Sequence, residues 1–150
     1  MEIILCEGYR IDISYKAMRA YLKKSGVNAF FYAWPKEDYG EENRECVRIY
    51  GNDVPPGEEY YYIVSSEDFG HIAPYGLVKK HEILTDGLSR ADTTLIEVLK
   101  ELKHDADPNR MLSIATIPDD IEWHIDSDPE YGGEWVVEGP VPRVWYGKPL

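Results

Sequence analysis

The sequence predicts an α+β fold: a single compact domain over residues 1–150 with a mixed sheet, two helices and a C-terminal antiparallel hairpin. Three observations lead to this prediction. Apolar and polar residues alternate in 121–126 and 134–138, which is the period of half-buried strands. Two other stretches repeat apolar residues at helical spacing. A chain of 150 residues with 43% hydrophobic content suits one hydrophobic core.

The sequence pattern of the C-terminal third predicts the most stable sheet of the molecule. A strand-like run at 112–117 precedes the two alternating strands, which are joined across Gly132-Gly133. Glycines can supply the positive φ that a hairpin turn needs. Trp123 and Trp135 lie on the two facing strands and predict a cross-strand aromatic pair, worth about 0.2–1 kcal/mol.

The chain opens as strand, helix and strand. Residues 2–6 are expected to form a short buried strand, and residues 28–34 a second one. Between them, Ser14 is placed to cap a helix over Tyr15–Lys24, and Gly26 is a reasonable stop. A crossover of this kind is compatible with a parallel pair of strands.

The middle of the chain predicts strands at 46–50 and 60–65, then an irregular segment, 66–85, with one short strand at 82–84. The second helix starts after Asp92, a good N-cap. Its core-facing stripe consists of Leu95, Ile96, Leu99 and Leu102.

The net charge of −12 argues against binding to nucleic acid, which needs a basic face. It is compatible with solubility, with docking on a basic protein surface, or with mimicry of the charge of DNA. Cys6 and Cys46 are expected to be reduced, buried thiols. No apolar run is long enough to cross a bilayer and no leader follows Met1, so a cytoplasmic protein without a cofactor is expected.

Four segments of the sequence carry a resemblance: Asp92–Val98, Ile117–Trp123, Gly133–Glu138 and Arg143–Trp145. Together they resemble a family of small uncharacterised proteins encoded in phages and prophages of bacteria. Family members show a helix opened by Asp-Pro-Asp-Leu-Ile, an Ile-Pro-Asp-Asp-Val-Glu-Trp segment and a late Glu-Trp-Val-Ala-Glu. Two features differ: the family's Gly-Gly-Phe before the first helix and its His-Arg-x-Trp ending are both altered here. The resemblance implies a viral or mobile-element origin, action in the host bacterial cytoplasm and a fold, but no activity.

The first candidate site is the loop before the first helix. A helix N-terminus carries free backbone N–H groups and a partial positive charge, which suit a phosphate. Arg10 is placed to clamp the anion, Tyr9 to stack on a base or ribose, and Ser14 begins the helix. The alternative is a capped helix with a solvated Arg10 and a half-buried Tyr9, since the loop lacks a glycine-rich phosphate signature.

The second candidate site is the C-terminal aromatic group. Trp and Arg are favoured at binding hot spots, and Arg143, Trp145 and Tyr146 lie in an extended tail. The alternative is a core in which Trp123 and Trp135 pack inward and the proline-rich tail covers a sheet edge.

Glu122, His124 and Asp126 are expected to project from one face of one strand. They are the only candidates for a metal cluster or an acid/base set, and the alternative is the wet face of an ordinary strand. In the run Tyr60-Tyr61-Tyr62, alternation places Tyr61 opposite its neighbours. This alternation leaves one aromatic face of the sheet exposed, which predicts either a homo-oligomer interface or a surface that binds a ligand.

Three functions follow from these features. The first is a phage-encoded binding protein that sequesters a nucleotide-type signal of host antiviral defence, with Tyr9, Arg10 and the aromatic tail as its site. The second is an acidic inhibitor directed at a basic host protein, motivated by the −12 charge and by acidic runs such as 36–42. The third is a metal-dependent enzyme. The sequence favours the first, and neither membrane nor direct nucleic-acid binding is expected.

Overall fold

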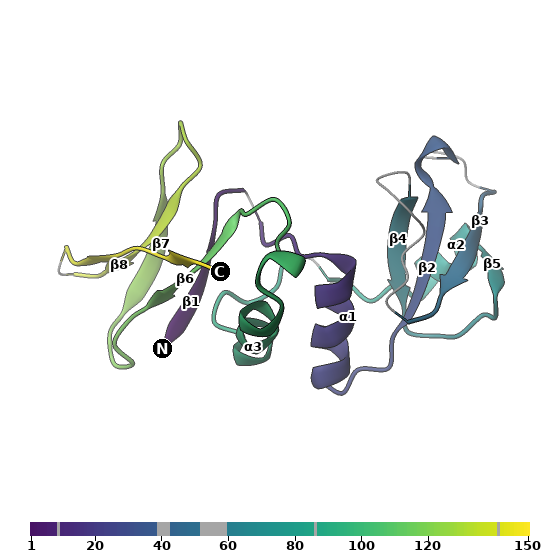
Figure 1. Ribbon diagram of the computed structural model, residues 1–150, viewed down its shortest axis with the longest axis horizontal. Helices are drawn as coiled ribbons and strands as arrows, with labels where there is room; N and C mark the ends of the chain where they lie inside the picture. Colours follow the sequence, from purple (N-terminus) through teal and green to yellow (C-terminus); the bar gives the residue numbers. More distant parts are fainter. Residues whose placement is uncertain (9, 39–42, 52–59, 86, 141) are drawn as a thin grey trace. The chain divides into compact units, whose positions relative to one another are not determined.

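The computed structural model describes residues 1–8, 10–38, 43–51, 60–85, 87–140 and 142–150 (Figure 1). Within these residues, three α-helices accompany strands in three antiparallel sheets, so the α+β class and the C-terminal hairpin are confirmed. The chain divides into two compact units, residues 1–21 with 86–150, and residues 22–85. The expectation of one domain stays a prediction.

The first sheet of the first unit joins strands from opposite ends of the chain. Its order is β1 (Glu2–Cys6), β6 (Leu112–Thr116) and β10 (Lys148–Pro149), with Cys6 opposite Leu112. The parallel pairing of the first two strands, which the opening of the sequence allowed, is therefore not formed. The first strand pairs with a strand that offers apolar partners to Ile3, Ile4 and Cys6, while the second pairs with its own neighbours in the other unit.

A second sheet packs on the first. It contains β7 (Trp123–Ser127), β8 (Glu134–Glu138) and β9 (Val144–Trp145). One apolar cluster is shared by both sheets. Its buried members are Ile3, Leu5, Ala115, Ile117 and Val136, and half-buried Trp123, Ile125 and Trp145 pack against it. These two sheets therefore form a sandwich whose inner faces make the core.

The expected Trp123–Trp135 pair is wrong. Trp123 lies opposite Glu138, and Trp135 lies opposite Asp126. The register differs from a Trp–Trp pairing by three residues, and an odd shift places two side chains on opposite faces of the sheet. Trp123 accordingly belongs to the inner face, while Trp135 projects from the other side.

The turn between β7 and β8 depends on one of its two glycines. Gly132 has a φ of 76°, so the positive φ expected here is confirmed. A Cβ on Gly132 would lie 2.6 Å from the backbone oxygen of Glu7, whereas a Cβ on Gly133 would meet nothing within 4 Å. Gly132 therefore lets the turn approach the end of β1.

Both expected helices of this region are confirmed. α3 (Thr93–Leu102) starts at Asp92, whose carboxylate accepts the N–H groups of Thr94 (3.0 Å) and Leu95 (3.1 Å). α3 contacts β1, where Ile4 is fully buried. α1 (Tyr15–Lys24) crosses the boundary between the units, and its residue Tyr21 donates a hydrogen bond from its hydroxyl to Asp92.

The second unit is a four-stranded sheet in the order β4-β2-β3-β5, namely Tyr60–Ser65, Phe30–Pro35, Glu45–Ile49 and Ile72–Pro74. α2 (Tyr75–Lys80) packs on it through buried Val78. Sequence reasoning missed β5 and α2, which lie in the segment expected to be irregular. Pro74 is compatible with both elements: it ends an edge strand and it is the N-cap of α2, and its lack of an N–H group is tolerated at both positions. The strand expected at 82–84 is a single bridge from Glu82 to Ser65.

Two arginines of the second unit pack on aromatic rings of its sheet. The guanidinium of Arg44 lies 3.8 Å from the ring centre of Tyr75, and that of Arg48 lies 4.6 Å from the ring centre of Phe30. Arg48 also pairs with Asp68 at 2.6 Å. The N–H of Gly70 and then Arg48 hold the pKa of Asp68 below its usual value. These charges therefore stabilise the sheet by local pairing.

The cysteines are free and buried, as expected. Burial raises the pKa of the Cys6 thiol, and it raises the pKa of Cys46 to about 11. Both thiols are therefore protonated at neutral pH, and a protonated thiol is a poor nucleophile.

One ion pair in the first unit connects β1, β8 and the approach to α3. Arg90 donates to both carboxylate oxygens of Glu134, at 2.6 and 3.1 Å, and to the carbonyl of Ile4 at 3.2 Å. The same carboxylate accepts the backbone N–H of Cys6 at 2.7 Å. Both side chains are largely buried, with 22% and 11% exposed. The pair therefore satisfies polar groups that the sandwich would otherwise leave unpaired.

We predict that Glu134→Gln lowers the free energy of unfolding by about 2–3 kcal/mol, because Arg90 then keeps its charge without a carboxylate partner. Urea denaturation followed by circular dichroism measures the change. Glu130→Gln, an exposed position on the same hairpin, is the control and should change stability by less than about 0.5 kcal/mol. Equal midpoints for the two variants would show that the pair does not hold the sandwich.

We predict that Gly132→Ala destabilises the protein by roughly 1–3 kcal/mol, through its positive φ and its clash with the backbone of Glu7. Gly133→Ala should be neutral or stabilising by up to about 1 kcal/mol, since its Cβ meets open space. Thermal melts of both variants test this, and the prediction fails if the two glycines tolerate alanine equally.

Candidate functional site

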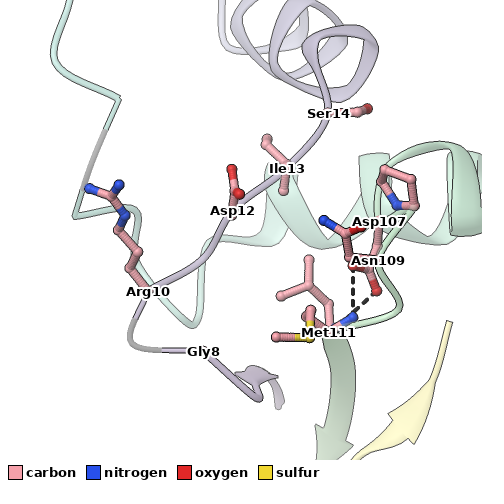
Figure 2. Close-up of a pocket in the computed structure, with 10 residues that line it drawn as sticks. Gly8, Arg10, Asp12, Ile13, Ser14, Asp107, Asn109 and Met111 are labelled. Atoms are coloured by element: carbon pink, nitrogen blue, oxygen red, sulfur yellow. Dashed lines mark hydrogen bonds between the residues drawn. The ribbon is translucent and has the colours of Figure 1, made fainter. Parts of the chain in front are cut away.

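The candidate site is a pocket of about 450 Å³ at one end of the β1–β6 pair (Figure 2). Past the end of the ladder, the N–H of Glu7 still donates to the carbonyl of Met111 at 2.9 Å. The two segments then separate and meet again where the N–H of Ser14 donates to the carbonyl of Ala106, also at 2.9 Å. The opening between these two contacts is the pocket. Its lining consists of Gly8, Arg10, Asp12, Ile13, Ser14, Asp107, Pro108, Asn109, Met111 and Leu112.

One wall of the pocket is the segment that leads into α1. Ser14 caps this helix: its Oγ accepts the N–H of Ala17 at 3.2 Å and donates to the carbonyl of Asp105 at 2.7 Å. Arg10 and Asp12 are both exposed, and in Figure 2 the Arg10 side chain extends away from Asp12 and Met111. This wall therefore offers a cation, a carboxylate and the start of a helix, set along a few residues of extended chain.

The other wall is a loop held by a buried carboxylate. Asp107 is 3% exposed and accepts the N–H groups of Met111 and Leu112, each at 2.9 Å (Figure 2). Its carbonyl accepts the N–H of Arg110 at 3.0 Å. Arg110 has a φ of 54°, in the left-handed region that non-glycine residues rarely adopt. The Asp107 hydrogen bonds fix the loop in this shape and so fix the floor of the pocket.

The structure brings two of the predicted site residues together. Arg10 and Ser14 line the pocket, while Tyr9 lies outside the described residues. The predicted residues of the tail, Arg143, Trp145 and Tyr146, do not line it.

The tail residues lie on the β7-β8-β9 sheet. Trp145 pairs with Val136 and packs half-buried against the sandwich core. The guanidinium of Arg143 lies 5.7 Å from the Trp145 ring centre and 3.7 Å from Glu138 Oε2. Tyr146 is 72% exposed. The end of the tail forms β10 on the edge of β6, which agrees with the alternative interpretation of the tail as an edge cover.

The three residues considered for metal or acid/base chemistry are exposed. His124 and Asp126 project from the same face of β7, and Glu122 precedes the strand. Within the part of the chain that the structure describes, no three His, Cys, Asp or Glu residues are grouped so as to hold a metal ion. Of the acidic run 36–42, residues 39–42 lie outside the described residues.

Sequence reasoning missed Asp12 and the whole second wall, including Asp107, Asn109 and Met111. A local signal was present, because Asp-Pro-Asn is a typical turn sequence. What places this turn opposite Arg10 is the antiparallel register of Cys6 with Leu112. That register is a long-range feature that no local pattern reveals.

No family model, curated protein or solved structure matches the chain. The resemblance to phage-encoded proteins therefore stays a prediction. No helix of the described residues is both long and apolar enough to cross a membrane.

We predict that Asp107→Ala lowers the free energy of unfolding by about 1–3 kcal/mol, since one buried and one partly buried N–H group lose their acceptor. Hydrogen exchange at the Met111 and Leu112 amides should accelerate as well. Asp105→Ala is the control: it keeps the carbonyl that accepts from Ser14 and removes an exposed side-chain contact with Lys16 at 3.7 Å, worth less than about 1 kcal/mol. Unchanged exchange at both amides in Asp107→Ala would contradict the role given to this carboxylate.

Proposed function

We propose that the protein is a non-catalytic binding protein that takes a small nucleotide-type molecule in the pocket between 8–14 and 107–112. The observation that carries this proposal is the pocket itself, whose volume of about 450 Å³ falls in the range of small-molecule sites. The resemblance to phage proteins supports a role in phage–host conflict, in which the protein sequesters a nucleotide signal of host defence.

The lining of the pocket supports a ligand with both anionic and neutral polar groups. An arginine such as Arg10 binds phosphate through charge-assisted hydrogen bonds. A carboxylate such as Asp12 accepts hydrogen bonds from ribose hydroxyls, as acidic residues do in dinucleotide-binding folds. The partial positive charge at the start of α1 favours negative charge nearby.

Apolar side chains supply the surface for a base. Ile13 and Leu112 are buried at the edge of the pocket, and Met111 is 40% exposed beside them. A flexible methionine adapts to flat ring systems. The overall charge of −12 opposes an anion, but salt screens charges beyond about 8 Å, so the groups within the pocket dominate.

We predict that at least one member of a panel of cyclic and linear nucleotides raises the melting temperature of the protein. Calorimetry should show that Arg10→Ala weakens binding of that nucleotide by about 10-fold or more, the loss of one charge-assisted contact. Lys80→Ala, which removes an exposed cation from the second unit, is the control and should leave the affinity unchanged.

Two results would overturn the proposal. The first is that no nucleotide shifts the melting temperature and that heat-denatured protein releases no small molecule detectable by mass spectrometry. The second is that the bound nucleotide is recovered in a chemically altered form, which would point to catalysis.

A further inference from the structure

One face of the β7-β8-β9 sheet points away from the sandwich core. Because paired residues share a face, the register places His124, Val137 and Val144 in one row across the three strands. Asp126 and Trp135 form the next row. We call these five residues the outer face. Its centre is apolar, with Trp135 and Val137 half-buried and Val144 40% exposed.

The chain that forms β7 and β8 of the outer face carries one sign of charge, while the exposed Arg143 precedes Val144 of β9. Residues 111–142 contain no Lys or Arg. Their acidic residues are Asp119, Asp120, Glu122, Asp126, Asp128, Glu130, Glu134 and Glu138. Glu134 is neutralised by Arg90, and Glu138 lies on the inner side of the sheet. Asp126 in β7 and Glu122 just before β7 are both exposed. The apolar centre therefore has an acidic rim.

An apolar centre that contains tryptophan, with a charged rim, is the usual anatomy of a protein interface. The rim decides the kind of partner. A second copy of this chain would bring an equally acidic rim to the contact, and like charges at an interface cost several kcal/mol. A basic partner would gain attraction and faster association from the same field.

We propose that the outer face is a docking surface for a basic protein segment, one that presents an apolar side chain between Lys or Arg side chains. The apolar side chain covers Trp135 and Val137, and the flanking cations meet Asp126 and Glu122. This surface goes beyond the ligand pocket and does not depend on it, because none of the five residues lines that pocket.

The test uses two synthetic peptides with alternating residues, lysine with valine and glutamate with valine. The lysine peptide should bind, and its NMR chemical-shift changes should centre on Trp135, Val137 and Val144. Asp126→Lys combined with Val144→Lys should weaken its binding about 10-fold or more. Glu67→Lys, an exposed charge change in the second unit, should change it less than about 2-fold. Melting temperatures of all variants confirm that they are folded.

Four outcomes would overturn the proposal. They are equal binding of the glutamate peptide, shift changes that map outside β7, β8 and β9, unchanged affinity in the double variant, and sedimentation showing a homodimer that Val144→Lys dissociates. Because Arg10→Ala leaves the outer face intact, loss of nucleotide binding in that variant with retention of peptide binding would separate this surface from the pocket.

Discussion

The antiparallel pairing of β1 with β6 is the constraint on which the first unit depends. It aligns Ile3 with Ala115 and so builds the apolar face that the second sheet covers. It also brings the segment after Cys6 next to the segment before Leu112, and the pocket is the opening between them. The N-terminal amine extends the same ladder by donating to the carbonyl of Ile117 at 3.0 Å. One register thus sets the core, the pocket and the position of the chain's first residue.

Buried and half-buried charged side chains provide hydrogen bonds to backbone groups at the edges of the apolar core. Burial of the end of β1 under the second sheet would leave backbone polar groups without hydrogen-bond partners. Glu134 accepts the N–H of Cys6, and Arg90 donates to the carbonyl of Ile4. Asp107 does the same for the loop at the other wall of the pocket. In both places a carboxylate accepts backbone N–H groups, which is a stronger contact than a neutral hydrogen bond. The acidic residues of this chain therefore fall into two groups, a few built into the structure and a larger number on its surface.

Elements with local signals could be predicted from the sequence, while long-range pairings could not. Ser14 and Asp92 mark the starts of two helices because a cap acts on the N–H groups of the next few residues. Gly132 marks a turn for a similarly local reason. The partner of β1 and the offset between Trp123 and Trp135 depend instead on contacts that no neighbouring residue reveals. The helix after Pro74 was missed because proline and glycine interrupt its short apolar period.

The same division explains the candidate site. Arg10 and Ser14 were recognised because a helix start is visible in the sequence, and one wall of the pocket follows from them. The other wall belongs to residues about two thirds of the chain length away, so Asp107 and Met111 carry no sign of their role until the register is known. The tail residues Arg143 and Trp145 share the composition of a binding site but occupy a sheet that also serves the core.

The β1–β6 pairing also has a consequence for how the protein is made. Cys6 leaves the ribosome long before Leu112, its partner in the ladder. Residues 22–85 form a compact unit of their own, so they can assemble during that interval, which lasts roughly 5–20 s at ordinary translation rates. The apolar strand Ile3–Cys6 stays unpaired throughout, and closing so long a loop adds an entropic cost that grows with the logarithm of its length. The strand β1 is thus buried only after β6 has been made, and until then its apolar side chains stay open to solvent.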